Sequence, residues 1–214
     1  MGIFCKKGDN PEKRIVKSYK RKSKETSIEI DVLDLDGTGV SSVSTTIGFL
    51  DHMITLFAYH GLFNIKLTAS GDTHVDKHHL NEDIGLALGE VFKKALGECR
   101  GITRIASQGA PMDMALAKVV VDISNRPAFS FKLTDKNAAD LSGEEEGYSM
   151  HYGMDFLESF AKKMGINLHV EVSGEGDIHH YLEAVFKAFG MAMDRATRVD
   201  SRRPLEVPSS KGIL

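Results

Sequence analysis

Two short runs of the sequence combine paired histidines with a glutamate at a spacing suited to metal binding. They are His78-His79-Leu80-Asn81-Glu82 and His179-His180-Tyr181-Leu182-Glu183. On an α-helix, residues three and four apart share a face, so either histidine of a pair can approach its glutamate. The other histidine then points about 100° away, and one run could serve two different ions. Imidazole and carboxylate together suit divalent ions such as Mn, Fe, Co or Zn.

The elements that must position these runs occur twice in the same order. Residues 49–97 and 152–197 each indicate a helix, a strand, a Gly-Asp turn, the His-His-x-x-Glu run and a long helix. Such repetition is typical of an internal duplication. We therefore expect an α+β fold made of two strand–helix halves, about 25–110 and 111–214. A pseudo-two-fold relation between them would bring two comparable metal sites into one assembly.

Composition limits the class of protein. The chain has 214 residues, of which 42% are apolar and 27% charged, and its net charge of −3 gives no general argument for nucleic-acid binding. Cys5 and Cys99 form no CxxC motif, so we expect neither a disulfide framework nor a thiolate metal site. No apolar run approaches the ~20 residues that span a bilayer, and no apolar signal core is present. We expect a cytoplasmic protein without a membrane partner.

Residues 1–24 are polar and contain a basic cluster. Its members are Lys13, Arg14, Lys17, Lys20, Arg21, Lys22 and Lys24. A basic arm can bind nucleic acid, but no aromatic interleaving or RNA-binding motif follows here. We predict a solvated, flexible N-terminal arm with no nucleic-acid partner, followed by a single domain over residues 25–214.

Longer motifs around the histidine pairs carry a resemblance to a known family. They are Gly48-Phe49-Leu50-Asp51-His52-Met53, His60-Gly61-Leu62-Phe63, Gly71-Asp72-Thr73-His74, His78-His79-x-x-Glu82-Asp83, Arg100-Gly101-Ile102-Thr103-Arg104, Lys187-Ala188-Phe189 and the terminal Pro-Ser-Ser-Lys-Gly. In combination, over about residues 25–214, they resemble imidazoleglycerol-phosphate dehydratase. The resemblance implies a lyase of histidine biosynthesis that converts D-erythro-imidazole-glycerol phosphate to imidazole-acetol phosphate.

The same resemblance implies a cofactor, a fold and an assembly. The cofactor is two Mn²⁺ per active site, although other divalent transition metals are possible. The fold is a duplicated α+β fold of the ribosomal protein S5 domain 2-like type, with sheets packed against a helical layer. The assembly is a homo-oligomeric cage of 24 subunits with active sites at subunit contacts.

The metal ligands implied by the family are His52, His78, His79, Glu82, His179, His180 and Glu183. The family pattern also has a counterpart of His52 one helix before the second histidine pair. This sequence has Asp155 there, and His151 lies one helical turn earlier. Asp155 could bind a hard ion such as Mn²⁺ directly. Alternatively, a shifted helix start could present His151, or this site could hold one ion more weakly.

Further residues are matched to the phosphate and to proton transfer. The family pattern implies phosphate binding by Arg104, Arg126, Lys187, Ser209 and Lys211, through guanidinium forks, lysine charge and a hydroxyl hydrogen bond. We expect the C-terminal tail to become ordered when phosphate binds. The implied proton shuttle is Glu25, which would act as general base and then as acid. Asp72 and Asp83 are more typical of residues that orient ligand histidines.

The expected chemistry depends on the imidazole ring of the substrate. If both ring nitrogens bind metal ions, the ring becomes an imidazolate that accepts charge when the adjacent carbon loses a proton. Two rival hypotheses compete with dehydration. One is a non-catalytic metal-binding or storage protein, which leaves the phosphate residues without a role. The other is a metal-dependent phosphohydrolase, which would release inorganic phosphate instead of forming a ketone.

Overall fold

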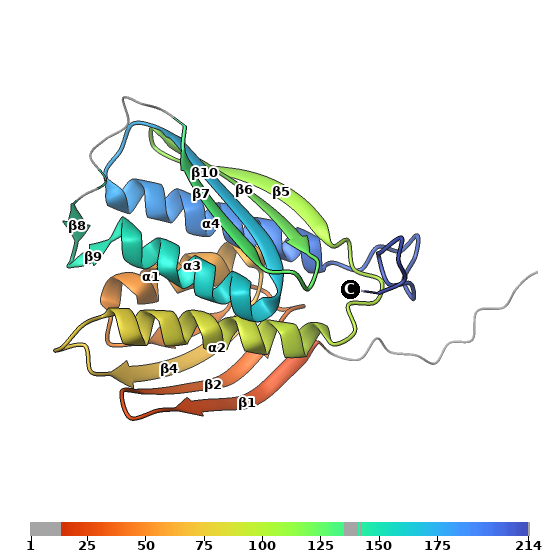
Figure 1. Ribbon diagram of the computed structural model, residues 1–214, viewed down its shortest axis with the longest axis horizontal. Coiled ribbons are helices and arrows are strands. Elements are labelled where there is room, and N and C mark those ends of the chain that lie inside the picture. Colours follow the sequence, from red (N-terminus) through yellow and green to blue (C-terminus); the bar gives the residue numbers. More distant parts are fainter. Residues whose placement is uncertain (1–13, 135–140, 142, 214) are drawn as a thin grey trace, which may run out of the picture.

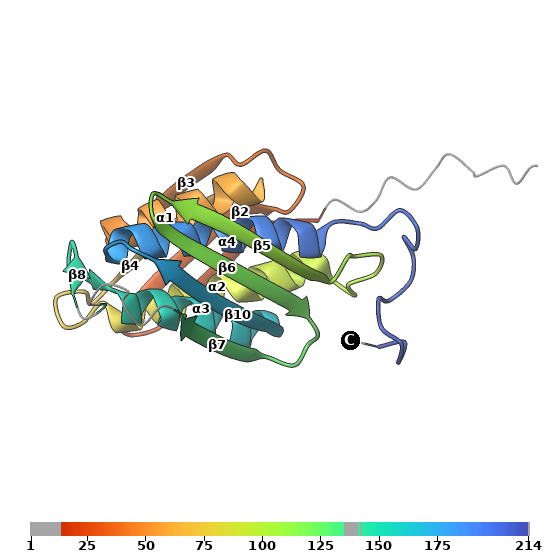
Figure 2. The ribbon, with the colours of Figure 1, turned by 90° about the horizontal axis from the view of Figure 1, so that it is seen from above.

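The computed structural model describes residues 14–134, 141 and 143–213. Within this part of the chain, four long helices form a layer between two four-stranded sheets (Figures 1 and 2). The apolar residues of the helices and of the inner sheet faces form one continuous buried cluster. This arrangement confirms the expected sheets packed against a helical layer. None of the described helices is long and apolar enough to cross a membrane.

Each half of the chain contributes one sheet and two helices. The first half contains β1 (Ile15–Lys22), β2 (Thr26–Asp34), β3 (Ser41–Ser44), α1 (Gly48–Gly61), β4 (Asn64–Gly71) and α2 (His78–Leu96). The second contains β5 (Ile105–Met112), β6 (Ala115–Ile123), β7 (Ala128–Leu133), α3 (Met150–Met164), β10 (Ile166–Gly174) and α4 (Ile178–Thr197). A short hairpin of β8 (Glu144–Glu145) and β9 (Tyr148–Ser149) precedes α3.

The two sheets have the same topology. Their strand orders are β1-β2-β4-β3 and β5-β6-β10-β7. In each sheet, the first three strands are antiparallel and the last pair is parallel. Strand by strand, the second half therefore repeats the first. The internal duplication predicted from the motif order is confirmed.

Alternating side chains explain the central strands. In β6, every second residue from Ala115 to Ile123 is buried against the helices, as expected for a sheet with one solvated face. The helices instead bury stripes with helical spacing, such as Leu80, Ile84, Leu88 and Val91 on α2. These two periodicities are the signals from which the sequence predicted the elements.

The helices pair across the two halves. Contact between α1 and α4 is close because a Cβ on Gly190 would lie 2.5 Å from the Phe57 carbonyl oxygen. The same relation joins α2 and α3, where a Cβ on Gly89 would lie 2.5 Å from the Phe160 carbonyl oxygen. Both glycines are needed for this close approach. As a result, the start of α2 and the start of α4, where the two histidine pairs lie, are each beside a helix from the other half of the chain.

The prediction of a flexible basic arm is wrong for residues 15–22. These residues form β1, which pairs antiparallel with β2 at the edge of the first sheet. Arg21 is tied to α2 through Asp83, and Lys20 pairs with Glu29 on the neighbouring strand. Basic side chains are compatible with a solvated edge strand, which explains why charge alone was misleading. Residues 1–13 of the predicted arm lie outside the described residues.

The boundary between the halves also differs from the prediction. Residue 110 falls inside β5, which already belongs to the second sheet, so the halves meet between α2 and β5. This strand was missed because Gly109 and Pro111 are unfavourable in a strand interior, and such residues are tolerated at a sheet edge.

Candidate metal centre and phosphate pocket

One group of three side chains converges as a metal site would require. His52 lies on α1, and His179 and Glu183 lie on α4; we call these residues the first donor set. The Nε2 atoms of His52 and His179 lie 3.4 and 3.3 Å from Glu183 Oε2. One ligand atom from each residue lies within 4.8 Å of the others. Two imidazole nitrogens and a carboxylate oxygen fit a divalent transition metal.

The carboxylate of the first donor set, Glu183, is buried but ionised. Glu183 is 8% exposed, and its Oε1 lies 2.6 Å from the Lys187 ammonium. Burial by itself would raise the pKa of Glu183, but the hydrogen bond and charge of Lys187, together with His52, lower it overall. Glu183 therefore stays ionised despite its burial.

A second group occupies the pseudo-equivalent place between α2 and α3. It contains His78, Glu82 and Asp155, which we call the second donor set. His78 Nδ1 lies 3.3 Å from Asp155 Oδ2, and His78 Nε2 lies 3.7 Å from Glu82 Oε2. Because the histidine faces the two acids with opposite ring nitrogens, this set converges less closely than the first. Asp155 Oδ2 is buried and has no hydrogen-bond partner among the described residues. A bound cation would satisfy this oxygen by coordination instead.

The helix start decides how Asp155 and His151 are placed. Helix α3 begins at Met150, and Ser149 caps it by accepting a hydrogen bond from the Tyr152 amide. His151 and Asp155 then share one face, with His151 Nε2 3.3 Å from Asp155 Oδ2. Asp155 thus takes the place that His52 has in the first set, and His151 lies behind it. The roles of both residues as ligands stay predictions.

The second histidine of each pair points away from its donor set. His79 Nδ1 lies 3.2 Å from Asp72, and His180 Nδ1 lies 2.5 Å from Asp177. Both aspartates belong to the Gly-Asp turns. Their hydrogen bonds raise the pKa of His79 and of His180. They also fix the ring orientations, as partners of ligand histidines commonly do.

Glu25 lies close to one of these outward-facing histidines. Glu25 lies in the connection between β1 and β2. Its backbone carbonyl oxygen accepts a hydrogen bond from the Asp72 amide at 3.1 Å. The Glu25 carboxylate is near enough to contribute to the raised pKa of His79. Asp83 does not orient a histidine as predicted, because its carboxylate binds Arg21 and the Thr26 hydroxyl. It fastens the Glu25 region to α2 instead.

Four of the five predicted phosphate residues line one pocket. Its lining consists of Arg104, Ser124, Asn125, Arg126, Ser209, Lys211 and Ile213. The guanidinium of Arg104 binds Asp122 and also donates to the Pro208 carbonyl oxygen at 2.9 Å, which holds the tail beside the pocket. Lys187 is not in this lining and pairs with Glu183 instead. Ser124 and Asn125 were missed because their Ser-Asn-Arg-Pro run resembled a simple turn.

This candidate phosphate pocket and the donor sets lie at opposite ends of the helices. His179 is in the first turn of α4, whereas the Arg104 amide binds the carbonyl oxygen of Ala196 near its end. At ~1.5 Å per residue, roughly 25 Å separates these two backbone positions. Figure 1 shows the same separation, with the C-terminal tail at the far end of α4 from the hairpin of β8 and β9. One small substrate cannot reach both places within a single chain.

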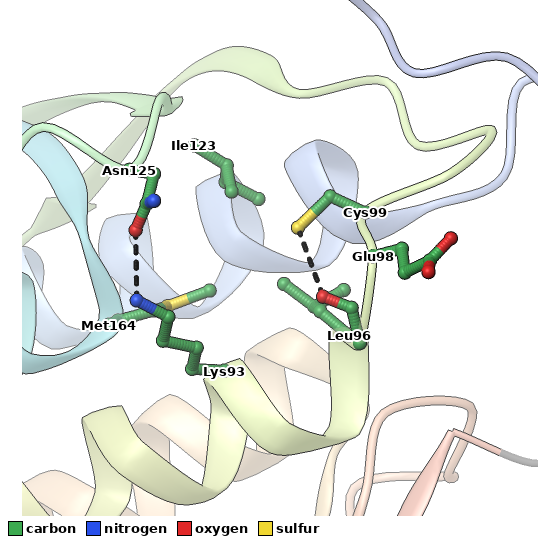
Figure 3. A pocket seen from close by; sticks show the side chains of 8 residues that line it. Lys93, Leu96, Glu98, Cys99, Ile123, Asn125 and Met164 are labelled. Atoms are coloured by element: carbon green, nitrogen blue, oxygen red, sulfur yellow. Dashed lines mark hydrogen bonds between the residues drawn. The ribbon is translucent and has the colours of Figure 1, made fainter. Parts of the chain in front are cut away.

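A smaller pocket adjoins the candidate phosphate pocket at the end of α2 (Figure 3). The two share Asn125, whose Oδ1 accepts a hydrogen bond from Lys93 at 2.8 Å. Cys99 also lines this pocket, and burial raises the pKa of its thiol. A protonated thiol is a poor nucleophile, so Cys99 is not assigned a catalytic role.

Comparison with known proteins identifies the family. The model of the imidazoleglycerol-phosphate dehydratase family matches residues 45–193. The chain belongs to this family. The imidazoleglycerol-phosphate dehydratase of Prochlorococcus marinus is 46% identical over 91% of this chain and 94% of its own length. That of Methylorubrum populi is 42% identical over 92% and 98%.

Solved dehydratase structures agree with the fold. A structure from Pyrococcus furiosus, in complex with (S)-C348, has a TM-score of 0.75 at 34% identity, covering 92% of this chain and all of that one. A structure from Staphylococcus aureus has a TM-score of 0.71 at 31% identity, covering 86% and 99%. The activity is thus that of a lyase of histidine biosynthesis, the dehydration of imidazoleglycerol phosphate. Metal storage and phosphate hydrolysis are not favoured.

Proposed function

We propose that the dehydration takes place at composite sites, each holding two Mn²⁺ ions and built from more than one copy of the chain. The observation that carries this proposal is the separation of the phosphate pocket from both donor sets within one chain. The outward-facing His79 and His180 provide further imidazoles that a neighbouring copy could use. A closed assembly of 24 subunits, suggested by the family resemblance, would place these parts together.

The donor sets define what a bound ion would contribute. Divalent ions, when bound, supply Lewis acidity that stabilises negative charge on the imidazole ring of the substrate. The ligands are proposed to be His52, His78, His79, Glu82, Asp155, His179, His180 and Glu183. His79 and His180 are held by Asp72 and Asp177, so their rings are oriented before any ion arrives.

Proton transfer is assigned to Glu25. The hydroxyl on the carbon next to the imidazole ring leaves as water with a proton from solvent, and the Glu25 carboxylate removes the proton from the following carbon, which keeps its own hydroxyl. The resulting enol becomes the ketone of imidazole-acetol phosphate when Glu25 returns its proton to the carbon next to the ring and the enol hydroxyl releases its proton to solvent. Placement beside Asp72 and His79 supports this role, because a general base must lie within hydrogen-bond reach of the carbon acid.

Phosphate binding is assigned to the pocket of Arg104, Arg126, Ser209 and Lys211. Lys187 pairs with Glu183 of the first donor set in the same chain. It is therefore assigned to contact with the substrate at the metal centre and not to this pocket. The tail carrying Ser209 and Lys211 becomes more ordered when phosphate is bound. The phosphate thereby fixes the substrate while the ring lies between the metal ligands. The cytoplasmic location stays a prediction.

Product analysis tests the proposed function. Metal-free protein and protein reloaded with Mn²⁺ are incubated with imidazoleglycerol phosphate, and both ketone and inorganic phosphate are measured. We expect ketone formation that depends on Mn²⁺, without phosphate release. Release of phosphate would support the phosphohydrolase hypothesis instead. Retention of metal with neither product would support a storage protein.

A further inference from the structure

The two donor sets occupy pseudo-equivalent places but differ in chemistry. His52 of the first set corresponds to Asp155 of the second, where a carboxylate replaces an imidazole. The first set therefore offers two imidazoles and one carboxylate, and the second offers one imidazole and two carboxylates. His79 and His180 are pseudo-equivalent to each other and would add the same type of donor to either set. The difference at Asp155 is thus not cancelled elsewhere.

Charge around the two sets increases this difference. In the first set, Glu183 shares its carboxylate with Lys187 at 2.6 Å, and both side chains are largely buried. Glu145 also approaches His179, at 3.9 Å, but its side chain is 44% exposed and is screened by water. The position four residues after Glu82 is Leu86. Among the described residues, no lysine or arginine pairs with Glu82 or Asp155, so the second set is more negative.

Asp155 is placed as a ligand would be. Its Oδ2 is covered and makes no hydrogen bond with any described residue, although His78 Nδ1 and His151 Nε2 each lie 3.3 Å away. A buried carboxylate oxygen without a partner is unfavourable. A divalent cation would satisfy it. His151 is 77% exposed and lies on the outer side of Asp155, where it can hold the carboxylate in position.

We propose that the second donor set selects a hard ion such as Mn²⁺, whereas the first set also binds Zn²⁺ tightly. Asp155 determines this selectivity, and His151 is a positioning residue for it. The physical reason is that imidazole suits Zn²⁺ and Co²⁺, whereas carboxylate oxygens suit Mn²⁺ and Mg²⁺. This inference rests on the proposed two-ion function. It adds that the two ions of a site are not interchangeable.

Metal displacement tests the inference in the intact assembly. Protein loaded with Mn²⁺ is titrated with Zn²⁺, desalted, and analysed for both metals by mass spectrometry at each step. For the unmodified chain we expect two steps, in which one Mn²⁺ per chain leaves at low Zn²⁺ and the other only at higher Zn²⁺. Displacement of both ions in one step would overturn the selectivity.

Two reciprocal variants assign the steps. Asp155→His makes the second set resemble the first, and we expect both Mn²⁺ ions to leave in the low-Zn²⁺ step. His52→Asp makes the first set resemble the second, and both should then leave only in the high-Zn²⁺ step. Circular dichroism and the mass of the assembly identify a variant that does not fold. In that case the result of the other, folded variant assigns the steps. Two unchanged steps in a folded variant would overturn the assignment to Asp155.

The role of His151 is tested separately. Removal of a residue that orients a ligand typically lowers metal affinity by about 10–100-fold, so His151→Ala should weaken only the more tightly retained Mn²⁺. Lys162→Ala, on the same helix, is the control and should change neither step. An unchanged His151→Ala titration would remove the positioning role. If two Mn²⁺ ions bind and ketone forms but displacement has one step, the selectivity is wrong and the proposed two-ion function stands. If no Mn²⁺ binds, both the selectivity and the proposed function are wrong.

Discussion

At the scale of residues, the site consists of histidines whose two nitrogens have separate tasks. In His79 and His180, Nδ1 is held by an aspartate from a Gly-Asp turn, and Nε2 is the candidate ligand atom. In His180, Nε2 also lies 3.3 Å from Asp113 Oδ2. The sequence predicted the ligand types and the orienting role of Asp72. It assigned the same role to Asp83, whose true partners, Arg21 and Thr26, come from elements that local spacing does not relate to α2.

Glu25 provides the first prediction at this scale. Glu25→Gln keeps the size and polarity of the side chain but removes its ability to accept a proton from the substrate carbon. We expect kcat to fall by a factor of about 10²–10⁴ or more, the usual contribution of general acid–base catalysis. Bound Mn²⁺ should be unchanged. Near-normal turnover would show that another group transfers the proton.

Asp72 provides a second prediction, which concerns pH. Because Asp72 raises the pKa of His79, a metal must compete with a proton that persists to higher pH than usual. Mn²⁺ affinity should therefore fall as pH decreases through this raised pKa. In Asp72→Asn the pKa of His79 returns toward its ordinary value, so the fall should begin at lower pH.

The same variant should bind metal more weakly at alkaline pH, by about 10–100-fold, because the ring is no longer oriented. Calorimetric titration with Mn²⁺ over a pH series measures both effects. Asp31→Asn, which alters an aspartate paired with Lys66 on the first sheet, is the control. Identical titrations for Asp72→Asn and the unmodified chain would remove His79 from the ligands.

At the scale of elements, helix pairing decides which residues meet. The first donor set joins His52 from one half to His179 and Glu183 from the other because α1 packs on α4. Periodicity predicted each helix, and the repeat predicted comparable sites. The pairing across halves depends on contacts such as Gly190 with the Phe57 carbonyl, and a glycine in an apolar helix stripe does not reveal its partner in the sequence.

This pairing gives the third prediction. Gly190→Ala should destabilise the protein although alanine favours helices, because its Cβ would lie 2.5 Å from the Phe57 carbonyl oxygen. Such overpacking typically costs about 1–3 kcal/mol in the free energy of unfolding. Gly48→Ala is the matched control in a helix, since nothing lies within 4 Å of the added atom. Thermal and denaturant unfolding measure both, and equal stability would contradict the packing described for α1 and α4.

At the scale of the whole molecule, the two ends of the helical layer carry different parts of the site. The candidate phosphate pocket lies at one end, and both donor sets lie at the other. The sequence predicted every one of these residues except Ser124, Asn125 and Ile213. It did not predict the separation, because long-range contacts place Arg104 at the end of α4. These contacts are the hydrogen bond from the Arg104 amide to the Ala196 carbonyl oxygen and the pairing of β5 with β6.

Composite sites lead to the fourth prediction. Glu183→Gln alters the first donor set and Lys211→Ala alters the phosphate pocket, so each variant alone should have low activity. When the two are dissociated, mixed and reassembled, some sites should combine an intact donor set with an intact pocket. Activity should then exceed the mean of the separate variants. A mixture no more active than that mean would indicate that each chain forms a complete site alone.

Anomalous X-ray scattering at the manganese edge, measured on crystals of Mn²⁺-loaded protein, tests the central claim most directly. The claim is that each chain contributes both donor sets to a two-ion site. We predict two anomalous peaks per chain, one among His52, His179 and Glu183, and the other among His78, Glu82 and Asp155. A single peak per chain, or peaks away from these residues, would contradict it.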